Sequence, residues 1–199
     1  KLYPDSGKSS RKIRQIKAST AVGASVRIAL SNTPRRALQE NNMLLKVGEN
    51  APVFSLPDAD MESVDMAAYK GKKHIVLFFY PKDGTPGCTM EATDFSDHEE
   101  DFHAQDCVLF GISRDECLKH AEFRDKEGIG TELLSDMEGV VCKQYGVWQA
   151  REVDGHRKFG IARSKFIIDK SGVIRHALYN VNYKGHALEV LRLVKELNS

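Results

Sequence analysis

One run of seven residues, HIVLFFY at 74–80, restricts the possible folds of this chain more than any other feature. After its first residue the run is apolar and rich in β-branched and aromatic side chains, a composition typical of a strand buried on both faces of a sheet. CVLFGIS at 107–113 predicts a second such strand. SKFIID at 164–169 and GVIRHALY at 172–179 predict two more, and the turn DKSG between them predicts a hairpin.

Helical patterns fill the segments between these strands. Residues 88–105 place apolar side chains on one face and acidic side chains largely elsewhere. The apolar set is Cys88, Ala92, Phe95 and Phe102, and the acidic set is Glu91, Asp94, Asp97, Glu100 and Asp101. Further helices are predicted over 115–127, 137–145 and 186–197. Strand–helix alternation followed by a hairpin and a terminal helix predicts an α/β or α+β layered domain around one sheet.

The net charge of +1 conceals an uneven distribution. Residues 1–42 carry a charge of +7, whereas 43–199 carry −6. The acidic main body argues against nucleic-acid binding, which needs clustered Lys and Arg. Because no run of about 18 apolar residues occurs, no membrane span is expected.

Residues 1–42 are rich in Ser and Arg and poor in apolar side chains, so they predict a leader separate from a domain over 43–199. Three interpretations of this leader remain open. It is a flexible segment or cloning remnant, an organelle transit peptide, or a nucleic-acid-binding tail. The expected location is the cytoplasm, or an organelle if the leader is a transit peptide.

The four cysteines, at positions 88, 107, 117 and 142, form no C-x-x-C pair. Their spacing is poor for a disulfide scaffold or a structural zinc site, and it favours a reducing compartment. We therefore expect no metal. Cys107, at the start of a predicted strand, is interpreted as a small buried apolar residue.

Cys88 stands between a predicted strand and a predicted helix, directly after Thr85, Pro86 and Gly87. Its sulfur should lie near unpaired backbone N–H groups and the positive end of the helix dipole, a position that favours an exposed, reactive thiolate. The alternative is a buried structural thiol. Pro81 closes the strand and can shield one side of the site, and the Thr85 hydroxyl can point toward whatever the sulfur attacks.

The acidic helix after Cys88 opposes thiolate formation, so the site needs a nearby cation. Arg163 is the candidate because it directly precedes the predicted strand at 164–169, and neighbouring strands of one sheet bring their ends together. A guanidinium stays protonated and donates hydrogen bonds in a fork. An ordinary surface arginine is the alternative.

At these residues the chain resembles the peroxiredoxins. Pro81, Thr85 and Cys88 fit the signature P-x-x-x-[T/S]-x-x-C. The surrounding sequence, over about 43–197, is similar to the bacterioferritin-comigratory-protein, or Q-type, group. The similarity is carried by the motifs FFYPKDGTPGCTMEA, VLFGISRD, LLSDMEG, YGVW, GIARSKFIIDKSG and YKGHALEVL. The resemblance implies a thioredoxin-like fold, a central mixed sheet flanked by helices.

The resemblance also implies a thiol-dependent peroxidase that needs no cofactor. Cys88 would reduce hydrogen peroxide or organic hydroperoxides and become a sulfenic acid, and Pro81, Thr85 and Arg163 would shape the pocket. The implied partners are the peroxide and an external thiol reductant, namely thioredoxin, glutaredoxin or a small thiol. The expected state is a monomer or weak homodimer with a role in antioxidant defence. Trp148 is interpreted as a packing residue.

The chain departs from the group at the resolving cysteine. The two usual positions are occupied by Thr93 and Arg124. The enzyme is therefore one-cysteine with an external reductant, or Cys117 or Cys142 resolves after local unfolding, or a partner subunit supplies the thiol. A redox sensor and a thioredoxin-like disulfide exchange protein are the alternative functions, although the absent C-x-x-C argues against the latter. Residues 152–160 are expected to form a mobile loop near the pocket.

Overall fold

A computed structural model describes residues 44–153 and 155–198, so the predicted leader lies outside the described residues. The core is a five-stranded sheet in the order β5-β4-β3-β8-β9. Its strands are β3 (His74–Phe79), β4 (Cys107–Ser113), β5 (Glu132–Ser135), β8 (Ser164–Ile168) and β9 (Ile174–Leu178). The first three are parallel, and β8 and β9 run antiparallel to their neighbours. The predicted mixed central sheet is confirmed.

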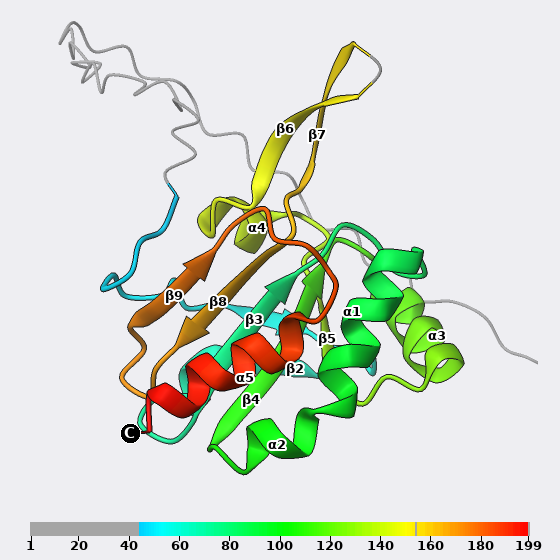
Figure 1. The fold of residues 1–199 in the computed structure, drawn as a ribbon. Coiled ribbons are helices and arrows are strands. Elements are labelled where there is room, and N and C mark those ends of the chain that lie inside the picture. The colour runs from blue at the N-terminus through cyan, green and yellow to red at the C-terminus, as the bar shows by residue number, and fades with distance from the viewer. Residues whose placement is uncertain (1–43, 154, 199) are drawn as a thin grey trace, which may run out of the picture. The chain divides into compact units, whose positions relative to one another are not determined.

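Helices cover both faces of this sheet (Figure 1). One face packs against α1 (Pro86–Asp97), α2 (Glu99–His103), α3 (Cys117–Glu127) and α5 (His186–Glu196), which share one apolar core. The opposite face packs against α4 (Val140–Gln144), the short ribbon β1 (Ser55–Pro57) and β2 (Ser63–Asp65), and the 3₁₀ helix η1 (Met66–Tyr69).

The central strand β3 explains why its sequence is continuously apolar. Its side chains alternate between the two cores, because successive residues of a strand point to opposite faces. Ile75, Leu77 and Phe79 enter the core under α4. Val76 and Phe78 enter the core under α1 and α5. All six residues of β3 are buried, as predicted.

Three predictions about element type or length were wrong. The helix expected over 88–105 is divided at His98, whose φ of −108° and ψ of 9° interrupt it between α1 and α2. The helix expected over 137–145 is only α4, because Gly139, with φ of 67°, starts it late. The loop expected over 152–160 is instead part of a hairpin, β6 (Trp148–Val153) and β7 (His156–Ile161), which projects from the domain (Figure 1).

The hairpin escaped prediction for a physical reason. Most side chains of β7 are exposed, so the strand shows no alternation of buried and exposed residues. Its pairing is local and needs no apolar face. By contrast, Trp148 at the base of β6 packs against the core under α4, as expected for a packing residue. None of the helices in the described ranges is long and apolar enough to cross a membrane.

The β8–β9 turn is held by the side chain of Asp169. Its Oδ1 accepts hydrogen bonds from the backbone N–H groups of Ser171 (2.9 Å) and Val173 (3.0 Å), and its Oδ2 accepts one from Nε of Arg175 (2.6 Å). Burial alone would raise the pKa of Asp169, but hydrogen bonds from the Ser171 hydroxyl (2.6 Å), the Val173 N–H and Arg175 lower it to about 2. The predicted hairpin therefore depends on an ionised carboxylate.

We predict that Asp169→Asn lowers the free energy of unfolding by about 1–2 kcal/mol at pH 7. Because the folded-state pKa lies below the usual value of about 4 for the unfolded chain, the contribution is complete above that value and is lost as the pH falls toward 2. Urea denaturation at pH 7 and pH 3 should therefore show a smaller loss at pH 3. An equal loss of unfolding free energy at pH 7 and pH 3 would contradict the role of the ionised Asp169 carboxylate.

Candidate active site

Cys88 lies in the first turn of α1, just past the end of β3. Thr85 occupies the N-cap with an extended backbone (φ −79°, ψ 143°), and Pro86 is the first helical residue. Proline fits this position because its missing N–H would have no helical partner there. The backbone N–H groups of Cys88 and Thr89 both donate to the Thr85 carbonyl, at 3.0 and 2.9 Å. The predicted strand–turn–helix setting is thus present, and the helix dipole favours negative charge on the sulfur.

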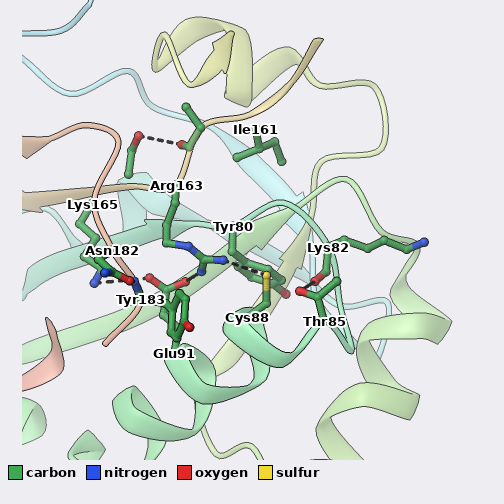
Figure 2. Close-up of polar contacts among 12 residues, drawn as sticks. Tyr80, Lys82, Thr85, Cys88, Glu91, Ile161, Arg163, Lys165, Asn182 and Tyr183 are labelled. Carbon is green, nitrogen blue, oxygen red and sulfur yellow. Dashed lines mark hydrogen bonds and ion pairs between the residues drawn. The ribbon is translucent and has the colours of Figure 1, made fainter. Parts of the chain in front are cut away.

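Arg163 reaches Cys88 from the neighbouring strand. It directly precedes β8, whose first residue, Ser164, pairs with Phe79 at the end of β3. Its Nη2 lies 3.2 Å from the Cys88 Sγ (Figure 2). The expectation that sheet pairing brings these two residues together is correct. The cation complements the acidic character of α1.

Cys88 itself is buried, with 1% of its surface exposed. An exposed thiolate was expected from the position at the helix start, and that expectation was wrong. The ring of Tyr183 packs closely against this turn at Gly87. The approach is so close that a Cβ added at Gly87 would stand only 3.0 Å from the ring. The same ring faces the Arg163 guanidinium at 5.8 Å. The side chain thus sits in a low-dielectric setting where the Arg163 charge acts more strongly than in water.

Glu91 belongs to the site geometry, although the sequence pattern placed it elsewhere. It was assigned to the polar side of the helix, but it is buried one turn after Cys88, on the same face. Its carboxylate accepts a hydrogen bond from Arg163 Nη1 and lies 3.4 Å from Lys165 Nζ. Burial raises the pKa of Glu91, and the two cations act in the opposite direction. The sequence feature that could have placed Glu91 beside the sulfur is its position three residues after Cys88, one helical turn away.

Pro81 and Thr85 lie at the two ends of the loop between β3 and α1. Pro81 is exposed beside the strand end, and Thr85 is half-buried. The Thr85 hydroxyl donates a hydrogen bond to the Lys82 carbonyl at 3.2 Å (Figure 2). Its proton is therefore engaged within the loop, and its oxygen remains able to accept.

A buried polar network supports this loop from below. The Tyr80 hydroxyl donates to Asp83 Oδ1 at 2.7 Å, and His120 Nδ1 lies 2.8 Å from Asp83 Oδ2. The backbone N–H of Asp83 donates to the Asp115 carboxylate at 2.9 Å. Sequence reasoning missed the network because its members come from the loop after β3, the turn after β4 and α3, and no spacing connects them.

The other three cysteines lie away from this arrangement, and all four are free thiols. Cys142 belongs to the core on the opposite face of the sheet, and burial raises its pKa. Cys107 starts β4 opposite His74, a strand length from Cys88, and burial raises its pKa to about 12. Cys117 is half-buried at the start of α3. Within 44–153 and 155–198 no three His, Cys, Asp or Glu side chains are grouped to hold a metal.

Comparison with known proteins decides the family. Residues 47–177 match the model of the AhpC/TSA family. The chain belongs to this family. It is 40% identical over 156 residues to "Peroxiredoxin Bcp" of Bacillus subtilis, covering 78% of this chain and 99% of that protein. The corresponding protein of Escherichia coli is 38% identical over 152 residues, covering 76% and 97%.

Solved peroxiredoxin structures share the fold. A mutant of PrxQ from Xylella fastidiosa superposes with a TM-score of 0.74 at 29% identity, covering 78% of this chain and 98% of that chain. The bacterioferritin comigratory protein of Xanthomonas campestris, described by its alkyl peroxide reduction activity, gives 0.70 at 31% identity, covering 73% and 92%. The thioredoxin-like fold and the Q-type resemblance are confirmed. This peroxiredoxin is a thiol-dependent peroxidase, and the alternatives of a redox sensor and a disulfide exchange protein are not favoured.

We predict that Tyr80→Phe lowers the free energy of unfolding by about 1–2 kcal/mol, because Asp83 loses a buried hydrogen-bond donor. Burial raises the pKa of Tyr80 well above its usual value, so the hydroxyl remains a donor at all working pH values. Tyr69→Phe is the control, since the Tyr69 ring packs on Phe110 and its hydroxyl takes no part in this network. Equal losses in urea denaturation would contradict the proposed network.

Proposed function

We propose that Cys88 is the thiol that reduces the peroxide. The observation that carries this proposal is the 3.2 Å contact between its Sγ and the Arg163 guanidinium, at the N-terminus of α1. The helix dipole and the cation both favour the thiolate, which is the nucleophilic form of cysteine. Cys107 and Cys142 have raised pKa values through burial and are poor nucleophiles.

The proposed step conserves atoms and electrons. The Cys88 thiolate attacks one peroxide oxygen and forms an S–O bond while the O–O bond breaks. The second oxygen leaves with the bonding pair and takes a proton as water or an alcohol. The sulfur is oxidised to a sulfenic acid. Substrates of this kind are hydrogen peroxide and organic hydroperoxides.

Arg163 and Thr85 are proposed to orient the peroxide. A guanidinium N–H that faces the sulfur also faces the oxygen on which charge develops, so it lowers the barrier to O–O cleavage. The Thr85 hydroxyl donates to the Lys82 carbonyl, so its lone pairs are free to accept a hydrogen bond from a hydroperoxide O–H. Pro81, at the exposed end of the same loop, shields the site on one side.

We further propose a one-cysteine cycle in which an external thiol reduces the sulfenic acid. Thr93 and Arg124 occupy the usual resolving positions, and Cys142 is on the other face of the sheet. Of the remaining thiols, Cys117 is the one at the same end of the sheet as Cys88, because α3 comes after the end of β4. The reductant is thioredoxin, glutaredoxin or a small thiol, and the enzyme acts as a monomer or weak homodimer.

We predict that one equivalent of hydrogen peroxide, with a sulfenic-acid trap present, modifies Cys88 alone and leaves three free thiols. Intact mass and peptide mapping measure both quantities. Loss of two thiols without an adduct would contradict the one-cysteine cycle and name the resolving residue. Cys88→Ser should abolish peroxide consumption with the fold intact, while Cys107→Ser retains it; full activity of Cys88→Ser would overturn the assignment.

We predict that Arg163→Ala slows the second-order reaction with peroxide by about 10²-fold, since a donor to the developing oxyanion is lost. Stopped-flow measurement under pseudo-first-order conditions gives this rate. Arg192→Ala is the matched control, because Arg192 is exposed on α5 and pairs with Glu196 one turn away. An unchanged rate in Arg163→Ala would remove the role proposed for the guanidinium.

A further inference from the structure

Lys165 is a lysine in an unusual place. It is the second residue of β8, and its side chain is fully buried. Lysine is almost never fully buried without a partner, because its ammonium loses hydration that the interior does not replace. It is two residues from Arg163, so both side chains point to the face of the sheet that α1 covers. Figure 2 shows Lys165, Glu91 and Arg163 on one side of Cys88, to its left in the view.

The surroundings of the Lys165 ammonium contain one close anion. Its Nζ lies 3.4 Å from Glu91 Oε1 and 5.1 Å from the centre of the Phe95 ring. Two further charges act on Lys165: the Arg163 guanidinium opposes its positive charge, and the Asp94 carboxylate on α1 supports it. Burial, followed by the Lys165 charge, lowers the pKa of His186 at the start of α5. The Asp94 carboxylate accepts a hydrogen bond from the backbone N–H of Ala187 (3.1 Å). Glu91 is therefore the main partner of Lys165.

Glu91 bridges Lys165 and Arg163 through its two carboxylate oxygens. Oε2 accepts from Arg163, and Oε1 faces Lys165. The cluster thus contains two cations and one carboxylate before Cys88 ionises. Once Cys88 is a thiolate, two cations balance two anions. Without Lys165, the buried cluster would instead carry one uncompensated negative charge in the reactive state.

We propose that Lys165 is a positioning residue that acts through Glu91 to keep the Arg163 charge available to the Cys88 thiolate. This inference rests on the proposed role of Cys88. Glu91 holds the guanidinium in place but also neutralises it. Lys165 compensates for that neutralisation from the side away from the sulfur. Glu91 therefore orients the guanidinium, while Lys165 offsets the negative charge that Glu91 brings to the site.

Stability alone does not account for the lysine. Buried ion pairs are weak sources of stability, and an apolar residue of similar volume is often as stabilising. Burial lowers the pKa of Lys165, so keeping its charge at this position is costly. The attraction of Glu91, whose Oε1 lies 3.4 Å from the ammonium, acts in the opposite direction and favours the charged form. A buried cation that reaches the sulfur only through Glu91 and Arg163 is explained by the charge balance with the thiolate.

Lys165→Met tests the proposal, because methionine keeps the length of the side chain and removes the charge. The pH dependence of Cys88 alkylation by iodoacetamide, followed by peptide mass, measures the midpoint at which half of this thiol is ionised. We expect the midpoint to rise by about one pH unit, since a neighbouring cation within the cluster is lost. The pH at which the rate of the peroxide reaction falls to half on the acidic side should rise by the same amount.

The double variant Glu91→Gln with Lys165→Met separates charge balance from packing. It removes one negative and one positive charge together, so Arg163 alone balances the thiolate and the midpoint should return to within a few tenths of a unit of the starting protein. The double variant also avoids leaving a carboxylate unpaired, so it tests the proposal if the single variant folds poorly. Lys170→Met is the matched control, because Lys170 pairs with Asp106 on the surface.

Two results would overturn the inference. An unchanged midpoint in Lys165→Met would show that the lysine does not influence the thiolate. A raised midpoint that the double variant fails to restore would show that Lys165 acts by packing. In both cases Cys88 would still react with peroxide, so the proposed function would stand. Failure of the proposed function would appear separately, as full activity in Cys88→Ser.

Discussion

The antiparallel pairing of β8 with β3 is the constraint on which the site depends. Because Ser164 pairs with Phe79, the residue before β8 arrives at the point where β3 gives way to the turn before Cys88. A slip of one residue would send the side chains of β8 to the opposite face of the sheet. The apolar register of the whole strand opposes such a slip, since Phe166 and Ile167 enter different cores. The packing of the β8 side chains in the two cores thus fixes the position of the Arg163 charge beside the Cys88 sulfur.

Burial and charge act against one another at Cys88. A buried thiol is normally inert because the interior disfavours its charged form. Here the positive end of the α1 dipole, the Arg163 guanidinium and the shared carboxylate of Glu91 replace the water that burial removes. The same exclusion of solvent strengthens each of these interactions. The site is therefore a small polar cluster that lies against the aromatic rings of Tyr183 and Phe95.

Strong local patterns in the sequence predicted the parts of the fold that depend on them. Four predictions of this kind were correct: the buried strand β3, the DKSG hairpin, the turn before Cys88, and the placement of Arg163 beside Cys88 by strand pairing. Glu91 was missed because a helical-face argument assumes that acidic residues face water, whereas this one is held inside by cations at β8. The turn before Cys88 packs at Gly87 against Tyr183, nearly a hundred residues later, and the Tyr80–Asp83–His120 network joins separate elements. Such contacts depend on tertiary packing and leave no periodic signal.

The β6–β7 hairpin has a consequence for how this protein can change over evolution. Its base is fastened where Ala162 N–H donates to the Val147 carbonyl at 2.7 Å, and Val181 N–H donates to the Arg163 carbonyl at 3.0 Å. These two bonds hold the backbone around Arg163 independently of the exposed outer part of the hairpin. Exposed loop tips accept insertions and substitutions readily. The hairpin can therefore vary in length and composition while the chemistry beneath it is inherited unchanged.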